Sequence, residues 1–322
     1  MLTDYTGHIA ALLTSLAWTS TSVFFTIGGR RVGSPIVNRT RLLLAVIFVL
    51  ITHTLTLGSP LPDAEPFRWG WLSLSGLLGF IVGDACLFQA FVMIGPRLAM
   101  LLMALAPVIN TAMGWLLLGE TLAPLELLGI ALAVGGVMVV VSDRRNGAQQ
   151  PGGMARQVDD PARDTRAARR TYLIGVLFGL GGAFGQATGL FASERGLVGD
   201  FPALSGNLIR LLTAATIIWV FTLARGQAVA GFRKLREHPR ALYAVIGGAV
   251  MGPFIGVWFS LIAVQRAPLG IASTLMSLAP IFLIPVARVV FKERVTARAV
   301  SGTILTVSGV ALLFLAPLLM TG

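Results

Sequence analysis

The chain has 322 residues, of which 55% are hydrophobic and only 12% are charged, with a mean hydropathy of +0.82. Soluble domains carry charge on about a quarter of their residues. The composition therefore excludes a soluble domain and predicts a protein whose outer surface faces lipid. The net charge of +11 does not indicate nucleic-acid binding, because the cations lie in short segments between apolar runs, as in loops beside a membrane.

Ten apolar runs are long enough to cross a bilayer as helices, which takes about 20 mainly apolar residues each. In chain order these predicted spans are 8–27, 36–57, 69–94, 97–118, 122–141, 171–191, 203–224, 241–264, 267–290 and 297–318. Tight Gly/Pro turns at 94–96 and 266–268 separate the third span from the fourth and the eighth from the ninth. No cleavable signal peptide is expected, because Asp4 and no basic residue precedes the first run and more spans follow it.

Residues 142–170 differ from the rest of the chain. They contain Gly, Pro, Gln, seven Arg and four Asp, with hardly any large apolar residue, which predicts a polar, disordered linker. The linker divides the spans five and five. We therefore predict two five-helix repeats, residues 1–141 and 171–322, joined by the linker 142–170.

The two halves repeat one another in sequence. The matches at one offset of 173 residues are Gly83 with Gly256, Pro107 with Pro280, Glu120 with Glu293, Gly129 with Gly302 and Gly136 with Gly309. At an offset of 169, Asn38 and Arg41 align with Asn207 and Arg210. Because each repeat has an odd number of spans, the second begins on the opposite side of the membrane. The fold class expected is all-α integral membrane, with two inverted repeats; this architecture is typical of secondary transporters with a substrate site near the midplane.

Polar residues inside the spans are the candidates for a substrate cavity, since a charged group avoids lipid. Asp84 is the only acidic residue near the middle of a span; it could carry a coupling proton, bind a cation or be a hydrogen-bonded packing residue. Arg41 and Arg210 could snorkel to the headgroups or bind a carboxylate or phosphate. The remaining polar candidates for the cavity lining are Gln89, Asn110, Gln186 and Asn207. Three aromatic residues could form walls of the cavity or pack against lipid or the core: Trp18, Phe184 and Trp258.

Proline and glycine predict where the helices bend and pack. Pro107 and Pro280 are expected to kink spans 4 and 9, because proline removes one helix hydrogen bond. Glycines at four-residue spacing predict close helix packing or sliding interfaces. These rows are Gly79 and Gly83, then Gly181, Gly185 and Gly189, then Gly248, Gly252 and Gly256. Glu120 and Glu293 lie in turns, where each is expected to stabilise the first turn of the next helix.

The sequence indicates neither catalysis nor a cofactor. The single cysteine, Cys86, lies in an apolar run, and the three histidines are scattered, so no disulfide and no metal site are predicted. The sequence contains no nucleophile–base pair and no nucleotide-binding motif in a structural context where either could function. The prediction is a carrier and not an enzyme or an ATP-driven pump.

Two paired blocks carry a family resemblance. They read LAPV…LLLGETL…GIALAVGGV and LAPI…VVFKERV…GTILTVSGV, and they occur with NRTRLLLAV around Arg41 and NLIRLLTAA around Arg210. This pattern resembles the drug/metabolite transporter superfamily, specifically the EamA-type ten-helix transporters, over the whole chain except the linker. The resemblance implies a central cavity between the halves and alternating access. It leaves the substrate class open between amino acids, other metabolites, nucleotide sugars and drugs. The resemblance assigns no catalytic role to Asp84, and Val257 occupies the equivalent place in the second half.

The leading functional hypothesis is a secondary transporter that exports a small metabolite or amphipathic compound, with the bilayer and protons as further partners. The alternative is a lipid-handling or flipping membrane protein. All but two of the 25 basic residues are Arg, which hints at a high-GC bacterial genome and hence a cytoplasmic (inner) membrane. Sorting these residues by alternate loops places 21 on one face and four on the other. The positive-inside rule then places the linker in the cytoplasm and both termini outside, whereas members of the family are usually drawn with both termini inside.

Overall fold

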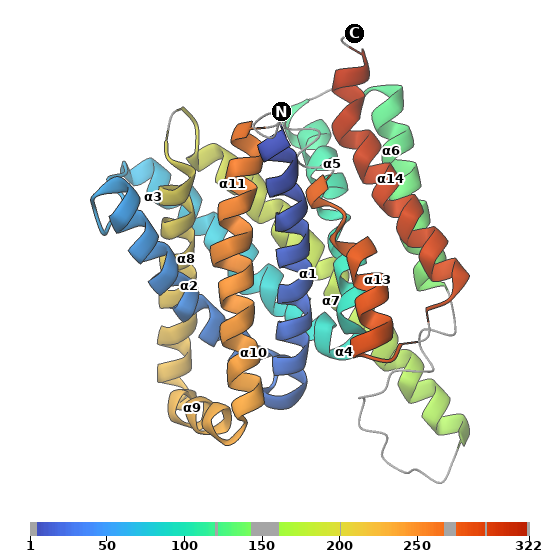
Figure 1. The fold of residues 1–322 in the computed structure, drawn as a ribbon, viewed down its shortest axis with the longest axis horizontal. Helices are drawn as coiled ribbons and strands as arrows, with labels where there is room; N and C mark the ends of the chain where they lie inside the picture. The colour runs from blue at the N-terminus through green and yellow to red at the C-terminus, as the bar shows by residue number, and fades with distance from the viewer. Residues whose placement is uncertain are drawn as a thin grey trace.

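The computed structural model describes residues 5–119, 122–142, 161–199, 201–266, 275–293 and 295–320, and these are helical with no strand (Figure 1). The first half contains α1 (Thr6–Val32), α2 (Ser34–Leu57), α3 (Pro66–Gly76), the π-helix η2 (Leu77–Gly83), α4 (Asp84–Met103), α5 (Ala106–Leu118) and α6 (Pro124–Val141). The second half contains α7 (Pro161–Gly196), α8 (Ala203–Ala224), α9 (Gln227–Glu237), α10 (Pro239–Ala249), the π-helix η3 (Val250–Gly256), α11 (Val257–Arg266), α13 (Ala279–Val290) and α14 (Ala297–Met320).

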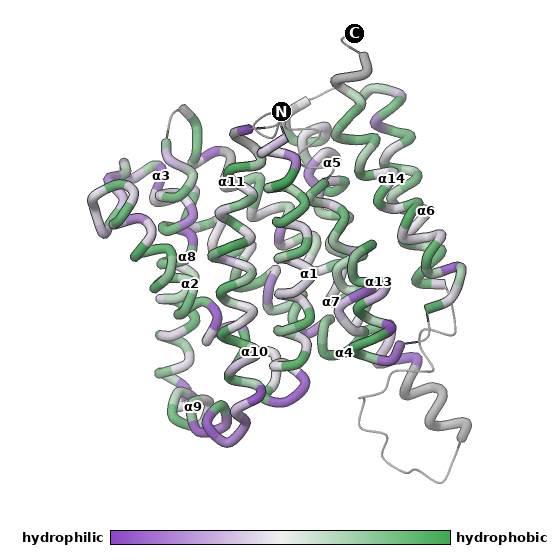
Figure 2. The backbone as a smooth tube through the Cα atoms, viewed as in Figure 1, coloured by the Kyte–Doolittle hydropathy of each residue, from purple (hydrophilic) through white to green (hydrophobic). Residues whose placement is uncertain are grey.

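Eight helical segments of the described chain are long and apolar enough to cross a membrane, judged by length and composition. The all-helical membrane class predicted from composition is thereby confirmed. Figure 2 shows apolar residues along most of the bundle and polar ones concentrated at α9 and at the lower turns. The helices α5 and α13 are apolar but have only 13 and 12 residues, fewer than the about 20 that one span needs.

The fourth and ninth predicted spans are interrupted. At the end of the third span, Gly95 has φ 80°, so the chain turns there as expected. The helix then ends at Met103, and α5 begins at Ala106 with Pro107 in its first turn. Pro280 has the same place in α13. A proline in the first turn loses no helix hydrogen bond. Each proline thus lies at the start of a new helix after a break, whereas a kink in a continuous helix was expected.

The linker is shorter than the sequence predicted. The helix α7 begins at Pro161, so residues 161–170, assigned to the disordered segment, extend a membrane-spanning helix. Arg and Ala have high helix propensity and dominate these ten positions. A low content of apolar residues rules out a core segment but does not rule out a solvated extension of a buried helix. The rest of the predicted linker, from 143 to 160, lies outside the described residues.

The two π-helices occupy equivalent positions in the repeats. Adding the offset of 173 to the bounds of η2, 77–83, gives 250–256, the bounds of η3. The breaks before α5 and α13 are related by the same offset, since Ala106 corresponds to Ala279. The sequence repeat is therefore also a repeat of the irregularities in the helices. Such irregular turns persist in membrane helices where they are buried in protein or line a cavity.

The last helices of the two halves, α6 and α14, pack closely through their repeated glycines. A Cβ on Gly136 would lie 2.5 Å from the carbonyl oxygen of Gly302, and a Cβ on Gly309 would lie 2.5 Å from that of Gly129. Gly129 thus meets Gly309 while Gly136 meets Gly302, so the two helices are antiparallel. Gly129 therefore faces Gly309, the repeat equivalent of Gly136, and Gly136 faces Gly302, the repeat equivalent of Gly129. A two-fold axis across the two helices requires this exchange. This geometry agrees with inverted repeats.

The other glycine rows also form helix contacts. A Cβ on Gly185 of α7 would lie 2.5 Å from the Cα of Gly83, and a Cβ on Gly189 would lie 2.8 Å from the nitrogen of Gly79. In the corresponding contact of the other half, Gly252 and Gly256 face Thr21 and Trp18 of α1. The small residues let α7 lie directly on η2. This close approach brings the second half to the irregular turn of the first.

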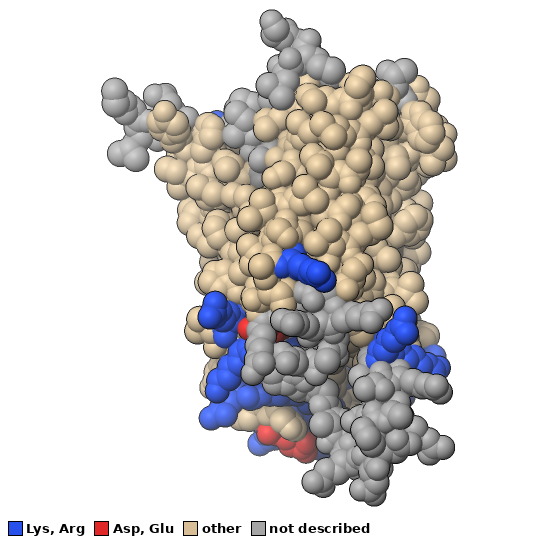
Figure 3. Space-filling model, turned by 90° about the vertical axis from the view of Figure 1, so that its right-hand side faces the viewer, with Lys and Arg blue, Asp and Glu red and all other residues tan. Residues whose placement is uncertain are grey.

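The ends of the bundle differ in charge. The start of α1 and the end of α14 lie at the top in Figure 1, whereas α9 and the start of α7 lie at the bottom. On the face shown in Figure 3, the Lys and Arg side chains gather in the lower half. Helix α9 alone carries Arg233, Lys234 and Arg236 at this end. The basic end is therefore opposite the end at which the described chain begins and finishes.

Candidate functional site

A buried ion pair lies inside the first half. The Nη2 of Arg41, on α2, contacts the Oδ2 of Asp84, the first residue of α4 after η2. The two residues are only 7% and 4% exposed. The two opposite charges stabilise each other by direct contact, although removing both of them from water is costly. The ring of Phe88 lies 5.0 Å from the guanidinium carbon of Arg41 and covers the pair.

Asn38 links this ion pair to the π-helix. Its Nδ2 donates to the carbonyl oxygen of Phe80 in η2 at 3.3 Å, and its Oδ1 accepts from the Nε of Arg41 at 3.4 Å. A π-turn disturbs the helical hydrogen-bond ladder, and such turns are frequent at functional sites. The side chain of Asn38 therefore satisfies a carbonyl of the irregular turn while it orients Arg41.

The second half contributes Gln186 and Arg210 to the same place. The Nε2 of Gln186, on α7, donates to the other carboxylate oxygen of Asp84, Oδ1, at 2.8 Å. Arg210, on α8, places its guanidinium carbon 4.7 Å from the centre of the Phe80 ring, and that of Arg41 lies 5.7 Å from the same ring. We call Arg41, Asp84, Gln186 and Arg210, with Phe80 between the arginines, the central polar cluster.

The close helix packing explains how Arg210 reaches this position. A Cβ on Gly76 would lie 2.4 Å from the carbonyl oxygen of Arg210, so a larger residue there would push α8 away. The side chain then extends beside Gly79, where a Cβ would lie 3.5 Å from its Nη2. The buried Nε of Arg210 has no hydrogen-bond partner among the described residues. The two arginines thus differ, since Arg41 is paired and Arg210 is not paired with an acid.

Of the ten cavity candidates, the structure brings together Arg41, Asp84, Gln186 and Arg210. Gln89 accepts a hydrogen bond from Ser34 at 2.6 Å, and the Oδ1 of Asn110, on the short helix α5, is buried without a partner in the described chain. Asn207 is partly buried one turn before Arg210. The aromatic candidates lie elsewhere: Trp18 is partly buried against Gly256, while Phe184 and Trp258 are 58% and 47% exposed.

Phe80 is the residue of the cluster that sequence reasoning missed. An apolar residue in an apolar span gives no signal by itself. The equivalent position at the offset of 173 is Pro253, so the repeat did not identify it either. Asn38 could have been identified, because Asn and Arg three residues apart share a helix face and the spacing recurs at Asn207 and Arg210.

A second ion pair joins the halves near the basic end. The Nε of Arg97 lies 3.4 Å from the Oε2 of Glu293, in the turn between α13 and α14. Burial raises the pKa of the Glu293 carboxyl above its ordinary value, and the charges of Arg97 and Arg30 offset part of this rise. Glu293 therefore links α13 to the first half. The helix-start role expected of it stays a prediction. Glu120, its equivalent, lies outside the described residues.

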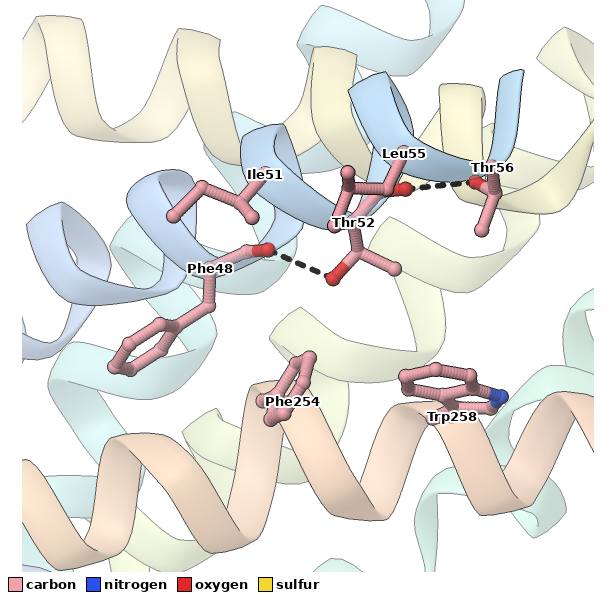
Figure 4. A pocket seen from close by; sticks show the side chains of 7 residues that line it. All are labelled: Phe48, Ile51, Thr52, Leu55, Thr56, Phe254 and Trp258. Carbon is pink, nitrogen blue, oxygen red and sulfur yellow. Dashed lines mark hydrogen bonds between the residues drawn. The ribbon is translucent and has the colours of Figure 1, made fainter. Parts of the chain in front are cut away.

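An apolar groove opens on the side of the bundle between α2 and the η3–α11 helix. It has a volume of about 180 Å³, and its lining residues are Phe48, Ile51, Thr52, Leu55, Thr56, Phe254 and Trp258 (Figure 4). The hydroxyls of Thr52 and Thr56 donate to carbonyls of their own helix, so they are satisfied without a ligand. Figure 4 shows Phe254 and Trp258 projecting toward α2. The groove is therefore an apolar surface on the outside of the helix bundle.

A metal is not suggested by the geometry. Among the residues that the structure describes, no three His, Cys, Asp or Glu side chains lie close enough to hold an ion.

The fold and the cluster define a class: a helical, multi-span membrane protein of two repeats that encloses buried polar groups. The model of the EamA-like transporter family matches residues 5–142 and again residues 173–315. The chain therefore belongs to the EamA-like transporter family and is an integral membrane transporter of small compounds. The two matches cover one half each, so the predicted duplication and the predicted resemblance are both confirmed.

Comparison with solved structures agrees on the fold. Among 27 matching chains, one crystal structure has a TM-score of 0.62 and 19% sequence identity, with 98% of this chain and 99% of that chain covered. At this identity the similarity concerns the fold alone. A comparison with curated proteins finds no match.

Proposed function

We propose that the protein is a secondary transporter that exports a small metabolite or amphipathic compound by alternating access, with its substrate site at the central polar cluster. The observation that carries the proposal is that Gln186 of the second half donates to Asp84 of the first, inside the membrane-spanning region. A polar contact between halves is a natural place for a site that both halves close in turn.

The breaks in the helices support the cycle. The breaks before α5 and α13 and the turns η2 and η3 recur at the same offset. Hinges are a few residues at the ends of elements that absorb a change of backbone angles. Equivalent hinges in the two repeats would let each half adopt the other's conformation, which is how inverted repeats exchange an outward and an inward state.

The test compares the metabolites retained and released by cells with the wild-type protein, with Gln186→Ala, or without the protein. Export predicts compounds that accumulate outside only with the wild-type protein, and a loss of that release in the variant. Thr188→Ala is the matched control, because the Thr188 hydroxyl donates only to carbonyls of its own helix. Equal release from all cells, at equal amounts of membrane-inserted protein, would contradict the proposal.

Proton coupling through Asp84 is the narrower hypothesis. Both carboxylate oxygens of Asp84 are held by partners, one by Arg41 and one by Gln186. A proton that binds Asp84 would remove its negative charge and so weaken both its pair with Arg41 and the hydrogen bond from Gln186, which joins the halves. The hypothesis predicts that Asp84→Asn abolishes transport driven by a pH gradient in proteoliposomes. Unchanged pH-driven transport in this variant would rule the hypothesis out.

A lipid-handling function is the alternative, and the lateral groove is the observation that favours it. Its lining is apolar, and three of its apolar residues, Ile51, Leu55 and Trp258, are exposed on the outside of the bundle. Widening the groove with Trp258→Ala and Phe254→Ala should alter lipid transfer if lipid is the cargo. The readout is fluorescent-lipid flipping in vesicles; flipping no faster than in protein-free vesicles would exclude this alternative.

For localisation we propose a bacterial inner membrane, with the basic end in the cytoplasm. The excess of Arg over Lys supports the bacterial membrane, and the separation of charge in Figure 3 supports the orientation, since cytoplasmic ends of spans carry the excess of Lys and Arg. Both termini are then outside.

A further inference from the structure

We infer that the substrate carries a single anionic group, a carboxylate or another monovalent acid, and that Arg210 binds it. This inference rests on the proposed transport function and adds the chemical class of the substrate. It follows from the difference between the two arginines of the central polar cluster.

The charges of the cluster do not cancel. Arg41 and Asp84 form a pair, which leaves the charge of Arg210. The ion pairs found among the described residues are Arg41–Asp84, Arg97–Glu293 and Arg233–Glu237, and Arg210 belongs to none of them. The place equivalent to Asp84 is held by Val257. The second half thus has the arginine but no acid at the position that matches Asp84.

An uncompensated cation inside a membrane protein is costly. A charged side chain at the centre of a span is unfavourable in lipid, so arginines inside spans face protein or a water-filled cavity. Such residues persist where they have a partner or a function. Arg210 is partly buried, its Nε has no acceptor in the described chain, and the ring of Phe80 holds its guanidinium at 4.7 Å. A bound anion would supply the missing acceptor and the missing charge.

The chemistry of the guanidinium selects the ligand. Arginine presents five N–H donors in one plane and no acceptor, which matches the two oxygens of a carboxylate. A net charge of one favours a monovalent acid over a dianion. Cationic amines find no free carboxylate in the cluster, because both oxygens of Asp84 already have partners. The same cluster therefore disfavours cationic drugs.

The experiment measures compounds released by cells that carry the wild-type protein, Arg210→Gln, Arg210→Lys or no protein. The compounds that only the wild type releases are sorted by the number of anionic groups that they carry at neutral pH. We expect them to be monovalent acids, with release at least 10-fold lower in Arg210→Gln and partly retained in Arg210→Lys, which keeps the charge.

Arg225→Gln is the matched control, because Arg225 lies at the end of the same helix and is stacked on Phe221 at 4.0 Å. It should leave release unchanged. Released compounds without an anionic group, or anions whose release is unaffected by Arg210→Gln, would overturn the inference while transport stands. No released compound at all would instead refute the proposed function. Folding of each variant is checked by size-exclusion chromatography in detergent, and a misfolded Arg210→Gln leaves the anionic groups of the released compounds as the deciding result.

Discussion

At the scale of single residues, the central polar cluster shows how a membrane protein accommodates charge. Arg41 is 7% exposed yet has an acid, an amide and aromatic rings around it. Asp84 is the residue on which this arrangement depends, because it joins Arg41 of its own half to Gln186 of the other. The sequence showed that Asp84 was unusual, whereas only the structure identified its partners.

A double-mutant cycle tests the pair. Asp84→Asn should lower the free energy of unfolding by about 3–5 kcal/mol, since it leaves a buried arginine without its counter-charge. Arg41→Met should cost less, because an aspartate can take up a proton and become neutral whereas a guanidinium stays charged. The double variant should lose less than the sum of the single losses. Thermal unfolding in detergent gives the four values, and strictly additive losses would show that the pair is not coupled.

Glu293 predicts a pH dependence of stability. Its folded pKa is raised above the ordinary 4.5 by burial. Its contribution is therefore fully present below pH 4.5 and is lost as the pH rises through the raised folded value. The melting temperature of the wild type relative to Glu293→Gln should fall as the pH increases from about 4 to 7. A difference that stays constant or grows over this range would contradict the assignment. Glu237→Gln is the control, since Glu237 is exposed.

At the scale of helices, glycine contacts determine how closely the halves approach. The contact of α6 with α14 depends on the absence of side chains at Gly129, Gly136, Gly302 and Gly309. Similar glycines place α7 on η2 and so bring Gln186 to Asp84. The sequence predicted that these rows pack, and the structure shows what each row meets. The partners could not be predicted, because a small residue fits many close contacts equally well.

Two neighbouring glycines of α6 provide a direct test. A Cβ on Gly136 would lie 2.5 Å from the carbonyl oxygen of Gly302, whereas a Cβ on Gly135 would meet nothing within 4 Å. Alanine favours a helix over glycine by about 0.8–1.0 kcal/mol, so Gly135→Ala should be neutral or stabilising. Gly136→Ala should destabilise the protein by about 1–3 kcal/mol through overpacking. Equal melting temperatures for the two variants would contradict the packing described here.

At the scale of the whole molecule, the two repeats and the distribution of charge determine topology. The helices α6 and α14 are antiparallel, and the described chain starts and finishes at one end of the bundle (Figure 1). The basic residues gather at the other end, where α9 lies (Figure 3). A membrane orientation with this basic end in the cytoplasm follows from the positive-inside rule.

A reporter fused after Gly322 tests this orientation. With the C-terminus outside, an alkaline phosphatase fusion should be active and a fluorescent protein that needs the cytoplasm should be dark. A second pair of fusions inserted at Gly226, next to α9, should give the opposite result. Cytoplasmic reporter activity at Gly322 would show that the charge count misleads and that the orientation usually drawn for the family applies.

The sequence by itself determined that this protein faces lipid, that it is helical and duplicated, and where most of its helices begin and end. Those properties depend on composition and on local periodicity, which a chain carries before it folds. The central polar cluster was decided by tertiary structure, because its members come from α2, η2, α4, α7 and α8 and meet only through packing. Arg41 and Arg210 are alike in sequence. In the folded protein Asp84 contacts Arg41 and not Arg210, so only Arg41 is a paired cation. Tertiary structure decides this difference because the attraction between two charges depends on the distance between them.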